Sequence, residues 1–174
     1  EKVTSVLPIA KAKKGKTEHA VVLQTEKGII KKVVAKDFED VRRSGIRAIN
    51  LEKDDTLRWA RIAVPGEEII LSTRFGQAIR FKEKDVRAMG RAAKGVRAMK
   101  LKKNDVIVGM DIIPPQGATK LTVLAVSELG FGKKTEVSQY RIQKRGGSGI
   151  KTCKVTPKTG SLISVQIVAN DVTE

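Results

Sequence analysis

The amino-acid sequence predicts an all-β fold, a partial propeller-like array of four-stranded blades with about three blades and one leftover strand. Short runs rich in Val, Ile, Leu and Thr are separated by glycine and turn residues, which is the pattern of β-strands. Four such runs form a unit, and the unit recurs at intervals of roughly 50 residues. A repeat of that length with four strands is typical of a radial array of blades.

Each unit starts with a predicted β-hairpin. The hairpin turns are "TEKG" (25–28), "TRFG" (73–76) and "SELG" (127–130), and each follows an apolar run. The first and third fit a type I turn followed by glycine in the left-handed region. We therefore expect two antiparallel strands around each turn.

A second glycine precedes the third strand-like run of each unit. Gly45, Gly95 and Gly149 start "GIRAINL", "GVRAMKL" and "GIKTCKV", and a closing run completes each unit. Because order and spacing match in three copies, we expect one blade per unit. The predicted segments are the end of an earlier blade (a strand at 1–9) with a basic link, together 1–20, and blades at 21–68, 69–119 and 120–174.

The composition indicates a polyanionic partner. The chain has 174 residues, of which 40% are hydrophobic, and a formal net charge of +16. The apolar share is enough for a packed core, and the excess of cations is typical of nucleic-acid binding. Aromatic residues make up only 3%, too few to stack successive bases, so duplex DNA held by its phosphates is favoured over a single strand. The lone Cys153 fits a reducing compartment and no run is apolar enough to cross a membrane, so we expect a cytoplasmic protein.

The sequence offers little for catalysis. His19 and Cys153 are the only residues of their types, which excludes the usual zinc sites and means that any Ser–His or Cys–His pair would have to use His19. Tyr140 has no activating neighbours. The stretch "GGSGIKT" resembles a nucleotide-binding loop, but Ile150 interrupts the required Gly-Lys pair and a strand-like run follows instead of a helix. We expect no catalytic residue, no metal and no cofactor in this chain.

Cations recur at fixed offsets from the repeat glycines. One lies four residues after each turn glycine, at 32, 80 and 134, and another lies two residues after each second glycine, at 47, 97 and 151. The loop before each second glycine is also basic. Residues 84–94 have cations at helical spacing, but Gly90 disfavours a helix and we favour an irregular loop. The predicted DNA contacts are Lys32, Arg42, Arg43, Arg47, Arg80, Lys84, Arg87, Arg91, Lys94, Arg97, Lys133, Lys134, Lys144, Arg145 and Lys151.

Two long segments resemble a known family. "GQAIRFKEKDVRAMGRAAKGVRAMKLKKNDVIVGMDI" (76–112) and "GFGKKTEVSQYRIQKRGGSGIKTCKV" (130–155) are similar to the C-terminal domain of the DNA gyrase A protein. The resemblance implies a β-pinwheel, a propeller-like disc whose blades exchange strands. It also implies non-sequence-specific wrapping of duplex DNA around a basic rim, in support of ATP-dependent negative supercoiling. The implied partners are DNA, the rest of the gyrase A protein and the gyrase B protein. ATP and magnesium would belong to other parts of that enzyme, which is associated with the bacterial nucleoid.

The family's gyrase A box has a counterpart near the C-terminal end. "QKRGGSG" matches six of its seven positions, with serine in place of the second cation. In the family the box lies in the first blade, whereas here the match lies in the last repeat, so we interpret it as a degenerate copy and expect the functional box upstream. The copy comprises Gln143, Lys144, Arg145, Gly146, Gly147, Ser148 and Gly149.

Three alternatives stay open at this stage. The closely related C-terminal domain of topoisomerase IV is similar. A basic propeller-like scaffold could instead bind an acidic protein, and a salt titration of duplex binding separates that function from DNA wrapping. An enzyme with a site between blades is disfavoured by the residues available.

Overall fold

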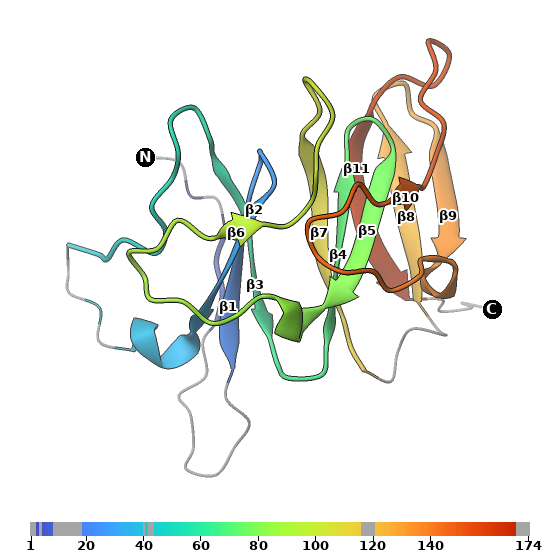
Figure 1. Ribbon diagram of the computed structural model, residues 1–174. Coiled ribbons are helices and arrows are strands. Elements are labelled where there is room, and N and C mark those ends of the chain that lie inside the picture. The colour runs from blue at the N-terminus through green and yellow to red at the C-terminus, as the bar shows by residue number, and fades with distance from the viewer. Residues whose placement is uncertain are drawn as a thin grey trace.

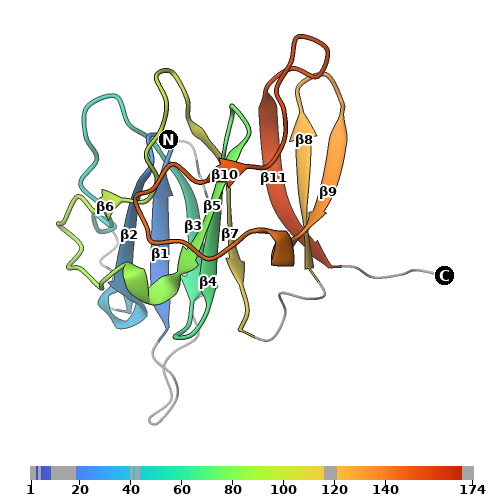
Figure 2. The same cartoon turned by 45° about the vertical axis from the view of Figure 1, so that its right-hand side comes forward.

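The computed structural model describes residues 3, 5–8, 19–39, 41, 44–115 and 121–169 (Figure 1). These residues form eleven strands and three short 3-10 turns. The strands make three antiparallel sheets that stand side by side as an open fan (Figure 2). The all-β prediction is confirmed, and the fan is a partial propeller because the sheets do not close into a ring.

The first sheet has the strand order β3-β1-β2-β6. Its turn places Gly28 at φ +86°, where glycine is the favoured residue. The Thr25 carbonyl accepts the Gly28 N–H at 3.2 Å, and the Thr25 hydroxyl accepts the Ile29 N–H at 3.0 Å. The strands are β1 (Ala20–Thr25), β2 (Ile29–Val34), β3 (Leu57–Ala63) and β6 (Val96–Arg97).

The second and third sheets repeat this hairpin arrangement. The second has the order β10-β5-β4-β7, and the third has the order β11-β8-β9 among the described residues. Their strands are β4 (Glu68–Thr73), β5 (Gln77–Lys82), β7 (Ile107–Ile113), β10 (Ile150–Lys151), β8 (Leu121–Ser127), β9 (Gly132–Glu136) and β11 (Leu162–Ala169). The 3-10 turns are η1 (Ala35–Phe38), η2 (Glu83–Asp85) and η3 (Val137–Gln139).

The fourth strand of a sheet comes from the following repeat. β6 pairs with β2, and β10 pairs with β5, so each lies in the sheet before its own repeat. The strand exchange implied by the family resemblance is confirmed, whereas the expectation that the four runs of one repeat share a sheet is wrong. The exchanged strands pair over only two residues, and such short runs carry no sequence signal for which sheet they join.

Glycine permits the close approach at each exchange. A Cβ on Gly95 would lie 2.7 Å from the Ile30 carbonyl oxygen, and one on Gly149 would overlap the Ala78 carbonyl. Gly45, by contrast, has nothing within 4 Å, and the run "GIRAINL" that it starts is not a strand. The described residues contain no sheet before the first one, so this run has no partner strand.

The leftover strand predicted at 1–9 is not formed in its described part. Residues 3 and 5–8 have no strand structure, although Leu7 packs against a core cluster that contains Val21 and Leu23. A closing strand needs the first strand of its own blade as partner, and the described residues contain none for this segment. The basic link at 11–17 lies outside the described residues.

The core runs continuously between the sheets. One cluster joins side chains of the first two sheets, including Val22, Ile30, Ile69 and Phe81. A second cluster joins the second and third sheets. Asp111 on β7 adds a polar link, because one carboxylate oxygen accepts the Ile167 N–H at 2.7 Å and the other lies 3.5 Å from Nε of Arg61. Burial on both sides of β4 and β5 holds the three sheets in a fixed arc.

Candidate nucleic-acid interface

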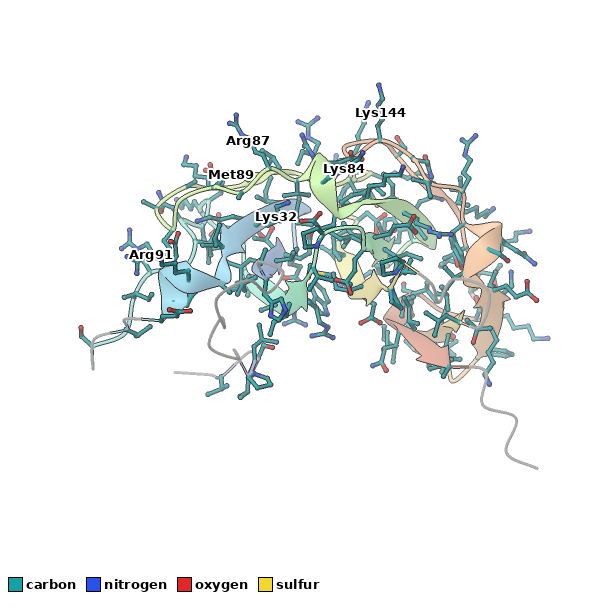
Figure 3. All side chains as sticks on the ribbon, turned by 90° about the horizontal axis from the view of Figure 1, so that it is seen from below. Lys32, Lys84, Arg87, Met89, Arg91 and Lys144 are labelled. Atoms are coloured by element: carbon teal, nitrogen blue, oxygen red, sulfur yellow. The ribbon has the colours of Figure 1, made fainter. Side chains whose placement is uncertain are left out.

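Two basic segments lie along one edge of the fan, which we call the outer edge (Figure 3). Residues 83–97 run from the second sheet to the first, and residues 137–151 run from the third sheet to the second. Each begins with a 3-10 turn, continues as an irregular loop and ends as the exchanged strand. The preference for a loop over a helix at 84–94 is confirmed. Figure 3 shows Arg87 and Lys144 projecting outward from this edge.

Backbone hydrogen bonds fix both segments at equivalent places. The Lys32 carbonyl accepts the Met89 N–H at 2.8 Å, and the Arg80 carbonyl accepts the Gln143 N–H at 2.8 Å. Glycines of the box-like stretch add two bonds, from Gly146 N–H to the Ala98 carbonyl at 2.7 Å and from Lys100 N–H to the Gly147 carbonyl at 2.8 Å. We call each such contact zone between successive repeats a joint.

Lys32 and Arg80, two of the predicted DNA contacts, are used inside the protein. The Lys32 ammonium lies 2.5 Å from a Glu83 carboxylate oxygen, and the Arg80 guanidinium lies 2.5 Å from Glu68. Arg80 also donates to the Val137 and Tyr140 carbonyls, at 2.9 and 3.1 Å. These side chains are almost fully buried, so the structure does not support a phosphate contact for either.

Lys32 and Arg80 are buried because the next repeat covers them. Each lies on the second strand of its sheet, four residues after the turn glycine, and the 3-10 turn of the next repeat packs over that position. The cation therefore meets the carbonyls or carboxylate of that turn instead of solvent. Lys134, the third member of the set, lies on β9, where the described residues contain no following repeat, and it is exposed.

Three further predicted contacts are only partly engaged. Arg145 donates from Nε to the Asp85 carbonyl at 3.1 Å and from Nη1 to the Arg97 carbonyl at 2.6 Å, across the second joint. The Lys94 ammonium lies 2.7 Å from Glu52, with both side chains 59% exposed. The Lys133 ammonium donates to the Thr152 carbonyl at 3.1 Å. Each of these cations remains at least partly exposed to a ligand.

The remaining predicted contacts are available at the surface. They have no ion-pair or side-chain hydrogen-bond partner among the described residues, and all but the half-buried Arg91 are exposed. Arg42 and Arg43 lie outside the described residues. The available cations are Arg47, Lys84, Arg87, Arg91, Arg97, Lys134, Lys144 and Lys151.

The sequence did not indicate the structural part played by one further cation, Lys31. Its side chain is fully buried, and its ammonium donates to the Ala48 carbonyl at 2.8 Å and to the Arg91 carbonyl. Burial lowers the pKa of this ammonium. Successive side chains of a strand point to opposite faces, so Lys31 and Lys32 of β2 lie on opposite faces of the sheet, and here both faces are covered. That alternation was the available signal.

The described residues provide no activated nucleophile. Burial raises the pKa of the Cys153 thiol, despite the opposing effect of Lys133 and Lys151 nearby. The Tyr140 hydroxyl is buried and hydrogen-bonded to the Thr152 hydroxyl. No cluster of three metal-binding side chains occurs within the described ranges. In the same part of the chain, none of the helices has the length and apolar character needed to cross a membrane.

The stretch "GGSGIKT" does not form a nucleotide-binding loop. Its glycines contact the neighbouring repeat, and β10 follows instead of a helix. Phosphate-cradling loops need free backbone N–H groups at a helix start, and this backbone is used in the joint. The exposed Lys151, on β10, is the cation of the stretch that can meet a ligand.

Comparison with known proteins gives a consistent set of similarities. The family described as "DNA gyrase C-terminal domain, beta-propeller" matches residues 19–63, 67–114 and 122–169. The DNA gyrase A protein of Staphylococcus epidermidis is 36% identical over 154 residues, 88% of this chain and 17% of that protein. The corresponding gyrase A protein of Ureaplasma parvum is 36% identical over 168 residues, 97% of this chain and 19% of that protein. The chain thus spans about a fifth of the length of these curated relatives.

Solved structures show the same fold. A structure of the DNA gyrase A C-terminal domain matches with a TM-score of 0.77 and 30% identity, over 90% of this chain and 51% of that one. The crystal structure of the C-terminal domain of DNA topoisomerase IV matches with a TM-score of 0.81 over 88% of this chain and 47% of that one. Its identity of 23% supports the shared fold alone.

Proposed function

The chain belongs to the family of DNA gyrase C-terminal domains, and from that premise we propose that it binds duplex DNA along its outer edge, without sequence specificity, and bends the duplex around the fan. The observation that carries this proposal is the set of exposed cations that successive repeats place on the outer edge. A curved row of cations suits a polymer with a phosphate at every step.

Non-specific binding follows from the kind of element on this edge. The described part of the outer edge consists of loops, two-residue strands and 3-10 turns of three residues, so it offers no helix long enough to enter a major groove. Bending 20–30 bp by 40–90° costs on the order of 1–6 kcal/mol. Many small phosphate contacts along an arc can offset that cost, as in other sequence-independent wrapping.

We place the chain as the DNA-wrapping part of a gyrase A protein that supports ATP-dependent negative supercoiling. The rest of that protein and the gyrase B protein would be its partners in the cytoplasm, and they would supply the cleavage, ATP and magnesium chemistry. The buried Tyr140 and the raised pKa of Cys153 agree with a non-catalytic role. The gyrase assignment is favoured over topoisomerase IV because the match to the gyrase A C-terminal domain carries 30% identity.

Duplex binding should be steeply salt-dependent. If roughly 6–10 phosphates are neutralised, the affinity falls by about 10³–10⁵-fold between 50 and 200 mM salt, because bound counterions are released. A fluorescence titration with two duplexes of about 30 bp and unrelated sequence measures this and should give equal affinities. Salt-insensitive binding, or none, would contradict the proposal, and capture of an acidic protein instead would favour the scaffold alternative.

A further inference from the structure

A shallow groove of about 520 Å³ lies at the first joint. Its walls come from two successive repeats, one from residues 46–47 and the other from residues 90–93. The groove is lined by Ile46, Arg47, Gly90, Arg91, Ala92 and Ala93. We call it the joint groove. Its lining holds two guanidinium groups and no carboxylate.

Three polar contacts hold the two walls together. The Lys31 ammonium donates to the carbonyls of Ala48 and Arg91, one on each wall. The Ala93 carbonyl accepts the Asn50 N–H at 3.3 Å. The Glu52–Lys94 ion pair adds a contact at the surface. Because these contacts hold the backbone on both sides, the Cα atoms of the two arginines keep their places before any ligand arrives, which lowers the entropic cost of binding.

The shape of the groove suits a compact anion. Its wall at 90–93 carries only small side chains besides Arg91, and a Cβ on Gly90 would meet nothing within 4 Å. A phosphate can therefore approach the backbone closely. The guanidinium group is a planar, permanently charged fork that binds phosphate oxygens in pairs.

We propose that the joint groove binds a single backbone phosphate of nucleic acid, gripped by Arg47 from one repeat and Arg91 from the next. This inference rests on the proposed function and deepens it, because it locates the contact at the joint between repeats. One phosphate touching two repeats also links DNA binding to the relative placement of those repeats.

The second joint has arginines at the same positions relative to its glycine as the first joint. Arg97 lies two residues after Gly95, as Arg47 does after Gly45, and Arg145 lies four residues before Gly149, as Arg91 does before Gly95. There the Arg145 guanidinium already contacts the Arg97 carbonyl, at 2.6 Å. The two arginine pairs thus recur at the spacing of the joints, and successive phosphate contacts are expected at that spacing.

The slope of log K against log salt is proportional to the number of phosphates that the protein neutralises. We would measure the affinity of the 174-residue chain for a duplex of about 30 bp at several salt concentrations, for R47Q, R91Q and the double variant. One shared phosphate predicts that the double variant lowers the slope of log K against log salt by about 0.9, with smaller changes for the single variants. Two separate phosphates would lower it by about 1.8 and would overturn the proposal. An unchanged slope would also overturn it.

A matched pair of cations provides the control. Arg87 and Lys144 lie on different outer-edge segments, 83–97 and 137–151, so the R87Q/K144Q variant should lower the slope by about 1.8. Replacing the Arg91 side chain leaves its carbonyl in place for Lys31, so the folding of R91Q, checked by circular dichroism, should be unchanged. If the unaltered chain binds no duplex, the proposed function fails; if it binds and the double variant loses about 1.8, only the shared phosphate fails.

Discussion

Replacing Arg80 with methionine should lower the free energy of unfolding by about 3–5 kcal/mol, because it leaves a buried charge without its partner. Glu68 would lose the guanidinium 2.5 Å away, and the carbonyls of Val137 and Tyr140 would each lose a donor. Those carbonyls belong to the third repeat, so the joint between the second and third sheets should weaken with the fold. Urea unfolding followed by circular dichroism measures the change.

The chain contains its own control for that substitution. Lys134 occupies the same position of the third repeat, but it is exposed and makes none of these contacts. Lys134→Met should therefore cost no more than an ordinary surface substitution. Equal losses for Arg80→Met and Lys134→Met would show that the buried contacts of Arg80 do not stabilise the fold.

Removing four outer-edge cations should abolish most of the DNA affinity. The variant replaces Lys84, Arg87, Lys144 and Lys151 with glutamine, all of them exposed and without intramolecular partners among the described residues. Loss of about four phosphate contacts lowers the slope of log K against log salt by about 3.6 and weakens binding by about 10²–10³-fold at 0.15 M salt. A salt titration of duplex binding measures both quantities.

The control removes the same charge from a different place. Lys27, Lys53, Lys102 and Lys103 are exposed between strands and lie outside the residue ranges of the two outer-edge segments. Their replacement by glutamine also removes four positive charges, so it tests whether net charge alone is responsible. Equal losses from the two variants would contradict an interface at the outer edge.

The repeat and its strands were predictable because each is a local pattern. The hairpin turn 25–28 needs a glycine at positive φ. The strand before it, Ala20–Thr25, is a buried run that contains β-branched residues. The exchanged strands were not predictable from spacing, since β6 and β10 pair over two residues each. Their partner sheet depends on how neighbouring repeats pack, which is a tertiary property.

The prediction of DNA contacts was limited for a similar reason. Lysine or arginine on a strand normally indicates a solvated face, and in β9 that holds for Lys134. For Lys32 and Arg80 the same position is covered by the 3-10 turn of the next repeat, so the charge is neutralised inside the protein. The loop cations Arg87 and Lys144 are exposed, because loops run over the surface, and their contact with DNA stays a prediction.

The box-like stretch 143–149 both joins two repeats and carries an exposed cation. Its glycines form the second joint through backbone hydrogen bonds, the Arg145 guanidinium adds bonds to the Asp85 and Arg97 carbonyls, and Lys144 is exposed. We therefore infer that this copy of the motif mainly joins repeats and adds one cation to the outer edge. The serine at position 148 is exposed and removes a charge that the family motif would place there.

If duplex DNA wraps around the outer edge with one handedness, the protein changes the linking number of a circle that is closed while the protein is bound. A nicked plasmid is saturated with the protein, sealed by ligase, stripped of protein and resolved by gel electrophoresis. Wrapping should shift the linking-number distribution in one direction as the protein is titrated, and the four-fold outer-edge variant should produce no shift. Saturated binding by the unaltered chain with an unchanged linking number would rule out wrapping of one handedness.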